Sequence, residues 1–413
     1  MSAVFDKLRS LPSWAKRHRT LAVVSALIVT LGTAGLGFAA CKSDDAPRGF
    51  ELRVAVPTSQ AGFSLALYQT LGARMTPGHE VTLISNGAVF DELDKSIRAA
   101  RSSVHVVMYI WEKGAASDRV VAALVDRARA GIACRIVVDD FGSPDFDEDV
   151  RPQLAEAGCE VRTFRPILEG TDELARNHRK IVVVDGNMAF VGGFGIRDEW
   201  LGDGVTSESW REASVRLVGP AVQGAQQAMA ENWQEAGGAF LPTEAFPRIA
   251  PLGAASVAVI GSSASSTSNR AERLMQLVFQ AATRRLWIAN AYFVPSEAML
   301  SMLERKASEG VDVRLLVPSK EHNDSKASAG MQPLKVGSLI ERGVRVLAYQ
   351  PSMMHAKTIV VDDDLSVVSS INLDPLSSSK LEEIAVVIQD TTFAASLART
   401  FEEDSARSER VER

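Results

Sequence analysis

The pattern His-x-Lys-x4-Asp occurs twice in this chain, and it constrains the fold more than any other feature of the sequence. The first copy comprises His178, Lys180 and Asp185, and the second comprises His355, Lys357 and Asp362. On a strand, residues two apart point to the same side. In each copy, branched apolar residues follow the lysine and predict a buried strand. Each aspartate then falls in a predicted turn, where we expect a structural role.

The segments around both copies repeat one order of strands and helices. In the first half we expect strands at residues 81–84, 103–111, 132–139 and 160–164, and helices at residues 90–100, 119–130 and 148–157. In the second half we expect strands at residues 285–294, 310–317 and 343–346, and helices at residues 271–283 and 297–309. Such alternation implies right-handed crossovers and mixed sheets flanked by helices. The sequence therefore predicts an α/β fold of two similar lobes, related by a pseudo-twofold axis that brings both motifs to one cleft.

The N-terminal region has the pattern of a membrane-directed segment. Residues 1–19 carry five basic residues and one acid, and Thr20 to Cys41 contains no charged residue. That stretch matches the roughly 20 residues that span a bilayer. A basic flank before it indicates a signal peptide or signal anchor with the rest of the chain outside. A buried helix of the globular domain is the third interpretation, but it would give the basic flank no purpose.

Residues 37–41 resemble a bacterial lipoprotein cleavage box that ends at Cys41, which would carry the lipid. Lipidation of Cys41 and an uncleaved anchor both remain open, because Phe38 replaces the preferred leucine. Either interpretation places a bacterial protein on the outer, periplasmic side of the inner membrane or on another envelope membrane. We therefore predict a basic flank with the membrane segment at residues 1–41, a tether at residues 42–65, a first lobe at residues 66–240 and a second lobe at residues 241–413.

The composition and net charge of the chain indicate which classes of partner it can bind. Apolar residues make up 46% and charged residues 23% of the chain, as in ordinary folded domains. The formal net charge of −6 gives no basic field for nucleic acid. Cys134 and Cys159 begin predicted neighbouring strands, so they are either small core residues or, on the oxidising side of a membrane, a disulfide. The sequence leaves the oligomeric state open, with a monomer as the default.

Two histidines with two lysines suit transfer of a phosphoryl group. One histidine can attack phosphorus and form a phosphohistidine, while the other protonates the leaving alcohol and later deprotonates the acceptor. The lysines supply positive charge for the non-bridging phosphate oxygens. This chemistry requires no metal ion and no other cofactor. His105, in contrast, lies in an apolar predicted strand, and we expect it to pack in the core.

From about residue 70 to residue 410 the chain resembles the phospholipase D superfamily, and within it the bacterial cardiolipin synthase-like branch. Besides the two motifs, the similar stretches are residues 210–212, 219–222, 290–295, 349–351, 372–375 and 401–404. The resemblance implies that His178 is the nucleophile and His355 the general acid and base. It also implies an acidic residue downstream of each motif that orients a histidine, at Glu212 and Glu383; the alternative is that both are solvated surface charges.

The resemblance further implies that Ser370 and Asn372 help to bind phosphate. The first copy departs from the family pattern, because Gly195 stands where an asparagine is expected. The second copy departs as well, with Ser369 in place of a glycine and Leu376 where the branch often carries arginine. These departures make the two halves of the predicted site unequal.

We expect a membrane-anchored phosphatidyltransferase of the cardiolipin synthase type, with phospholipid substrates, phosphatidylglycerol among them. A phospholipase D hydrolase that releases phosphatidic acid would share the covalent intermediate, so the motifs do not separate the two. A nucleic-acid phosphodiesterase is disfavoured by the acidic balance. A non-catalytic, lipid-binding envelope lipoprotein is disfavoured because both histidines and both lysines are intact.

Overall fold

The computed structural model describes residues 50–57, 59–167, 175–264 and 269–412. The predicted basic flank, membrane segment and Cys41 therefore lie outside the described residues. Within those ranges, no helix has both the length and the apolar character needed to cross a membrane. All described residues belong to one unit that begins at Phe50.

The strands of the two halves follow the same spatial order. The first lobe has the order β4 (Glu160–Phe164), β3 (Ala133–Asp139), β2 (Ser103–Met108), β6 (Ile181–Val184), β7 (Met188–Gly192), β8 (Ala213–Val218) and β1 (Thr76–Ser85). The second lobe has the order β12 (Arg345–Tyr349), β11 (Asp312–Pro318), β10 (Arg285–Ala289), β13 (Thr358–Val361), β14 (Leu365–Ser369), β15 (Leu381–Gln389) and β9 (Ala255–Ser262). In each lobe the first three strands are parallel and the others antiparallel, which confirms the predicted mixed sheets.

The two lobes join where β1 pairs antiparallel with β9. Two short strands complete the sheet: β5 (Arg176–Asn177) pairs with β15, and β16 (Ser408–Arg410) pairs with β12. The helices of the first lobe are α4 (Ala88–Arg98), α5 (Ala115–Arg129), α6 (Phe146–Asp149), α7 (Arg151–Glu156) and α8 (Val222–Glu235), with 3-10 turns η2 (Asp198–Trp200) and η3 (Thr243–Ala245). Those of the second lobe are α9 (Arg270–Ala281), α10 (Glu297–Ser308), α11 (Lys326–Glu341) and α12 (Thr391–Ser405).

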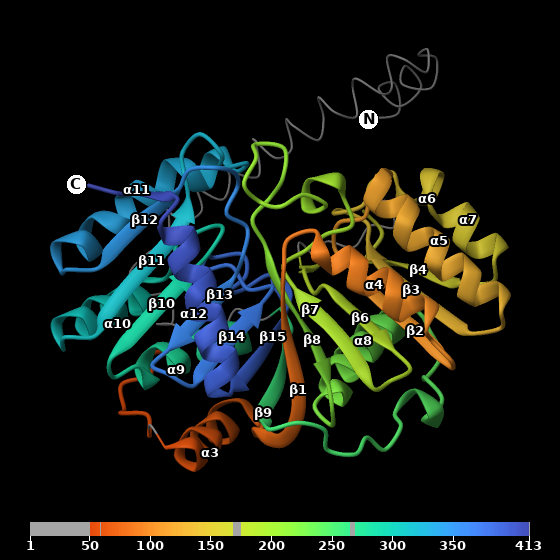
Figure 1. Ribbon diagram of the computed structural model, residues 1–413, viewed down its shortest axis with the longest axis horizontal. Coiled ribbons are helices and arrows are strands. Elements are labelled where there is room, and N and C mark those ends of the chain that lie inside the picture. Colours follow the sequence, from red (N-terminus) through yellow and green to blue (C-terminus); the bar gives the residue numbers. More distant parts are fainter. Residues whose placement is uncertain (1–49, 58, 168–174, 265–268, 413) are drawn as a thin grey trace, which may run out of the picture. The chain divides into compact units, whose positions relative to one another are not determined.

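Side chains of the motif strands alternate between cores, as strand geometry requires. In β6, Ile181 and Val183 face a central core between the lobes, whereas Val182 and Val184 face the outer core of the first lobe. In β13, Val360 likewise faces the central core. Figure 1 shows α9, α10 and α11 on one flank and α4, α5 and α7 on the other, with α8 and α12 near the middle. The predicted buried strands after each lysine are therefore confirmed.

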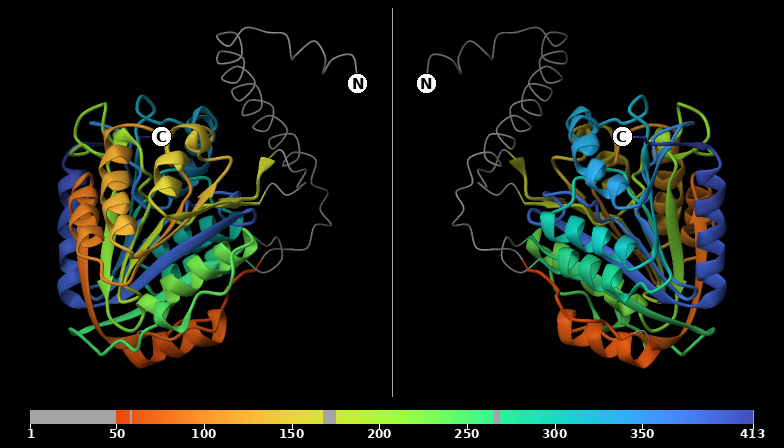
Figure 2. Two further views of the ribbon diagram at one scale, coloured as in Figure 1. Left: turned by 90° about the vertical axis from the view of Figure 1, so that its right-hand side faces the viewer. Right: turned by 90° about the vertical axis from the view of Figure 1, so that its left-hand side faces the viewer.

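Several predicted boundaries were wrong for identifiable reasons. The tether does not extend to residue 65, because α3 (Gln60–Leu71) begins after the cap Ser59 and buries Phe63 and Leu67 against the second lobe. Figure 2 shows α3 packed at one end of the molecule. The helix expected at residues 148–157 is divided into α6 and α7, since Pro152 lacks a backbone N–H and disfavours helix before it. The strand expected at residues 285–294 ends at Ala289, after which the Asn290 side chain bonds to Ile371 O and Leu373 N.

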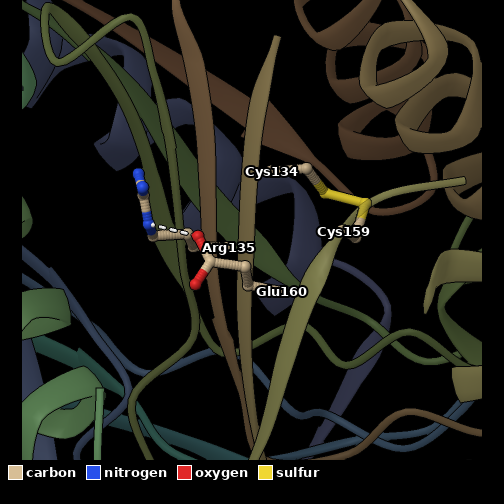
Figure 3. The surroundings of a disulfide bond; sticks show 4 residues. All are labelled: Cys134, Arg135, Cys159 and Glu160. Atoms are coloured by element: carbon tan, nitrogen blue, oxygen red, sulfur yellow. Dashed lines mark ion pairs between the residues drawn. A yellow bond between two sulfur atoms is a disulfide. The ribbon is translucent and has the colours of Figure 1, made fainter. Parts of the chain in front are cut away.

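The structure joins Cys134 and Cys159 in a disulfide. Cys134 lies in β3 and Cys159 directly precedes β4, and the two strands are parallel with Arg135 opposite Glu160. Figure 3 shows the bond beside the ion pair that those two residues form, with 3.1 Å between Arg135 Nε and Glu160 Oε1. Register therefore decides between the two interpretations that the sequence left open.

We expect the double variant Cys134→Ala/Cys159→Ala to lose about 3 kcal/mol of unfolding free energy, because the bond closes a loop of 25 residues in the unfolded chain. Urea unfolding of both proteins checks this. Reductant should weaken the wild type and leave the double variant unchanged, and two free thiols in the unreduced wild type would contradict the bond.

Candidate active site

The histidine and lysine of each motif lie directly before a buried strand. His178 and Lys180 precede β6, and His355 and Lys357 precede β13. All four side chains are buried. Each lysine turns back on its own motif, because Lys180 Nζ donates to His178 O at 2.8 Å and Lys357 Nζ donates to His355 O. The chain thus holds each ammonium group beside the imidazole of the same copy.

Backbone bonds pair each motif with the opposite lobe. Residues 176–177 pair with residues 381–382 in parallel, and His178 N donates to Glu382 O at 2.8 Å. In the other copy, His355 N and Ala356 N both donate to Arg211 O, at 2.8 and 3.0 Å. The residues that follow these partners in the chain are Glu383 and Glu212. Each glutamate is consequently delivered to the histidine of the other lobe.

The carboxylates and imidazoles therefore form crossed pairs. His178 Nδ1 lies 3.0 Å from both carboxylate oxygens of Glu383, and His355 Nδ1 lies 2.6 Å from Glu212 Oε2. A carboxylate that accepts from Nδ1–H fixes the tautomer and leaves Nε2 with its lone pair. Both glutamates are buried, so neither is a solvated surface charge.

The two carboxylates have different supports. Glu383 accepts from two hydroxyls, those of Ser370 and Ser377, the second at 2.7 Å. Glu212 accepts from the Trp200 indole N–H at 3.3 Å and from Ala213 N at 2.9 Å. The rings of Trp200 and Trp210 contact His355, with centroids 5.2 and 4.9 Å away. The site is thus hydroxyl-rich behind His178 and aromatic around His355.

Burial and charge set the protonation of the site. Burial lowers the pKa of His178 to about 4, although the Glu383 carboxylate opposes it, so this imidazole is neutral at pH 7. Burial, followed by the charges of Lys357 and Lys180, holds the pKa of His355 well below its usual value. Burial raises the pKa of Glu212 to about 7 and lowers that of Lys357 to about 8. Since each lysine acts on His355, charges from both copies meet in one place.

The two predicted phosphate ligands, Ser370 and Asn372, differ in their hydrogen bonding. The hydroxyl of Ser370 donates to Glu383, a contact that suits a residue that positions this carboxylate; phosphate binding by Ser370 stays a prediction. Asn372 is buried, and its side-chain oxygen has no hydrogen-bond partner among the described residues. That oxygen is an acceptor and would not bind a phosphate anion, which needs donors, so phosphate binding by Asn372 stays a prediction.

The departure at Gly195 has a structural reason. A Cβ atom there would lie 2.9 Å from the Trp200 ring and 3.1 Å from Ile110 Cβ. Trp200 thus fills the place in which an asparagine would stand. Trp200 and Ser377 occupy matching positions of the two copies, and each donates to the glutamate of its own lobe.

Both motif aspartates cap the start of a neighbouring strand. The Asp185 carboxylate accepts from the backbone N–H groups of Arg101, Ser102 and Ser103, at 2.7–3.1 Å. The Asp362 carboxylate accepts from those of Thr283, Arg284 and Arg285, at 2.8–3.3 Å. Both aspartates have positive φ, 52° and 47°. Neither carboxylate contacts a motif histidine, so the geometry gives both a structural role.

The sequence did not predict several contacts of buried side chains in and around the site. Arg211 Nε donates to Asp404 Oδ1 at 2.8 Å, and its Nη1 donates to Asn86 Oδ1 at 2.7 Å. Tyr109 packs edge-on against His178 with ring centroids 5.0 Å apart. His105, expected in the core, is fully buried and bonds through Nδ1 to Gln226 at 2.7 Å. These contacts join residues far apart in the sequence, so no local sequence pattern predicts them.

Comparisons with known proteins show the family to which the chain belongs. The family model described as "Cardiolipin synthase, PLD-like domain" matches residues 93–233 and 276–405. The chain belongs to the cardiolipin synthase branch of the phospholipase D superfamily. It is 34% identical to cardiolipin synthase A of Pseudomonas aeruginosa over 335 residues, covering 80% of this chain and 68% of that protein. It is 30% identical to cardiolipin synthase 1 of Bacillus cereus over 381 residues, covering 88% and 74%.

Solved structures show the same fold at low sequence identity. The phosphatidylserine synthase of Haemophilus influenzae superposes with a TM-score of 0.67 at 14% identity, over 84% of this chain and 92% of that chain. The polyphosphate kinase of Porphyromonas gingivalis superposes with a TM-score of 0.52 at 12% identity, over 91% of this chain and 54% of that chain. With the family match, they confirm the α/β phospholipase D-like fold.

Proposed function

We propose that this enzyme is a cardiolipin synthase-type phosphatidyltransferase that moves a phosphatidyl group from one phosphatidylglycerol molecule to another. The observation that carries the proposal is the pair of crossed histidine–glutamate contacts, His178 with Glu383 and His355 with Glu212. Two imidazoles whose Nδ1 atoms contact carboxylates, with Lys357 Nζ 3.1 Å from His355 Nε2, provide a nucleophile and an acid–base for a phosphodiester. The named relatives supply the substrate class.

The reaction proceeds in two balanced steps. In the first, the His355–Glu212 pair starts with an extra proton, so that His355 carries a proton on Nε2. His178 Nε2 attacks phosphorus, the bond to the glycerol oxygen breaks, and that oxygen takes the Nε2 proton, which leaves Glu212 ionised and His355 neutral with Nδ1–H. In the second, the hydroxyl of another phosphatidylglycerol returns a proton to His355 and attacks phosphorus, and His178 leaves. Lys180 and Lys357 offset charge on the non-bridging oxygens. Glycerol and cardiolipin are the products.

Burial of the imidazoles favours transfer over hydrolysis. His178 is 7% and His355 is 4% exposed, so little water reaches the reacting atoms. A phospholipid that enters with its headgroup excludes water further. We place the site at a membrane, on the outer side of the inner membrane or at another envelope membrane, because the substrates reside there. The uncharged segment before Cys41 supports that placement.

Labelled phosphatidylglycerol in vesicles tests the function directly. Purified full-length enzyme should yield cardiolipin and glycerol in equal amounts, identified by mass. Phosphatidic acid without cardiolipin would indicate the hydrolase instead. No turnover, with the fold intact, would contradict both.

The acid–base pair predicts a pH dependence. The proton for the leaving glycerol is held by the His355–Glu212 pair, in which burial raises the pKa of Glu212 to about 7. We therefore expect kcat/KM to fall as the pH rises above about 7. The Trp200 N–H stabilises the ionised carboxylate, so Trp200→Phe should raise the pKa of the pair and move this alkaline limb to higher pH.

The control is Trp233→Phe, which removes an indole N–H that donates to Ala239 O; the Trp233 ring is not among the aromatic rings that contact His178 or His355. Its pH profile should match that of the wild type. A Trp200→Phe profile that stays in place, or moves to lower pH, would disprove the role given to the indole.

A further inference from the structure

Matching positions of the two copies carry opposite charges beside the site. Arg197 stands as far beyond His178 as Asp374 stands beyond His355. The intervening strands β7 and β14 keep the same offset. Asp374 accepts from Ser377 N at 2.8 Å, and burial raises the pKa of its carboxyl to about 6. The site is therefore cationic at one of these positions and acidic at the other.

The guanidinium of Arg197 lies on the aromatic wall of His355. Its carbon Cζ is 4.8 Å from the Trp210 ring centroid and 5.3 Å from the Trp200 ring centroid. The same two rings contact His355. The charge of Arg197 also contributes to lowering the pKa of His355. A fixed cation thus stands one aromatic layer beyond the acid–base imidazole.

Arg197 keeps donors available. Its Nε donates to Glu199 at 2.7 Å and its Nη1 to Glu112 at 3.4 Å, and its Nη2 has no hydrogen-bond partner among the described residues. The Arg197 side chain is 22% exposed, and the two glutamates are 38% and 43% exposed. Because such solvated pairs are weak, an anion can bind the free edge of the guanidinium.

We propose that Arg197 binds the phosphate of the acceptor phospholipid. The inference rests on the proposed function, in which His355 deprotonates the acceptor hydroxyl. In phosphatidylglycerol, that hydroxyl and the phosphate are separated by the three carbons of one glycerol. The acceptor phosphate must then lie beyond His355, away from the lysines that hold the reacting phosphate. Arginine recognises phosphate through paired N–H groups, and Gly195 offers no side chain for this task.

Two transfers from the same phosphohistidine provide the test. Wild type and Arg197→Gln are incubated in phosphatidylglycerol vesicles with labelled glycerol, and cardiolipin and labelled phosphatidylglycerol are measured together. Cardiolipin needs an anionic acceptor, whereas exchange uses neutral glycerol. The ratio of cardiolipin to exchange should fall about 10- to 100-fold in Arg197→Gln, the value of a charged hydrogen bond. Inactive protein cancels in this ratio.

Arg216→Gln is the matched control, because Arg216 is 24% exposed and also lies near two glutamates, Glu80 and Glu92. Its ratio should equal that of the wild type, and Arg197→Lys should retain part of it. An unchanged ratio in Arg197→Gln overturns the inference, whether both rates persist or both fall together. Wild-type enzyme that exchanges glycerol without making cardiolipin overturns the proposed function, and the acceptor role with it.

Discussion

Replacing His178 with asparagine should lower kcat/KM for phosphatidylglycerol by at least about 10⁴-fold, since His178 is the proposed nucleophile that forms the covalent intermediate. Burial lowers the pKa of His178 to about 4, so the imidazole is in the neutral form that the proposed attack on phosphorus requires. Its Nδ1 is occupied by Glu383, so Nε2 is the attacking atom. His355→Asn should cause a comparable loss on this substrate, because glycerol is a poor leaving group without a proton.

An activated donor separates the two histidines. The p-nitrophenyl ester of phosphatidic acid releases a phenolate that needs no proton. With this donor, His355→Asn should give a burst of nitrophenol equal to the number of sites and then stall as the phosphohistidine, because no base activates the acceptor. His178→Asn should give no burst. Rapid-quench absorbance and phosphohistidine detection after alkaline quench measure both outcomes.

His322→Asn is the control, since His322 is partly exposed and its backbone N–H bonds to Ser319. It should retain wild-type turnover. A burst in His178→Asn and none in His355→Asn would reverse the roles and make His355 the nucleophile.

Local pattern was sufficient to predict the motif strands and the turns that follow them. Alternation places Ile181 and Val183 on one face and Val182 and Val184 on the other, so a strand buried on both faces follows from four residues. The turn positions of the motif aspartates also follow from local pattern, because aspartate tolerates positive φ. The N–H groups that their carboxylates accept from lie 77–84 residues away in the sequence and were not predicted. The repeat also predicts that both lobes share one strand order, because the same sequence pattern dictates the same fold twice.

The pairing of each histidine with the glutamate of the other lobe could not be predicted from local pattern. Glu383 reaches His178 because β5 pairs with β15, a contact between residues about half the chain apart. Glutamates downstream of each motif were the right residue type, but periodicity says nothing about which histidine each one meets. The burial of Arg179 could not be predicted for the same reason. Arg179 is the variable residue between His178 and Lys180 in the motif, and it is fully buried. The catalytic roles of these residues remain predictions.

Arg179→Met should lower the free energy of unfolding by about 3–5 kcal/mol, the cost of removing one partner from a buried charged network. Arg179 Nη1 donates to Ala228 O at 2.8 Å and to Asn232 Oδ1 at 3.1 Å, and Nη2 donates to Ser262 O at 3.2 Å. These bonds tie the first motif to α8 and β9. Turnover should fall as well, because His178 would lose its anchor. Urea unfolding measures the first effect, and Arg216→Met, a partly exposed control, should change stability by no more than about 1 kcal/mol.

The loss of unfolding free energy in Arg179→Met should also depend on pH. The direction of this dependence follows from the titration of Glu382. This buried carboxyl lies 4.0 Å from Arg179 Nη1, and burial raises its pKa above 4.5 while the charge of Arg179 opposes that rise. Without Arg179 the folded-state pKa rises further, and a raised carboxyl pKa means that stability is lost as the pH rises through it. The variant should therefore be least stable, relative to wild type, near pH 8 and closest to wild type near pH 5. Adding Glu382→Gln should restore part of the stability and remove this pH dependence; a deficit that grows toward acid pH would mean that Glu382 is not the charge that Arg179 neutralises.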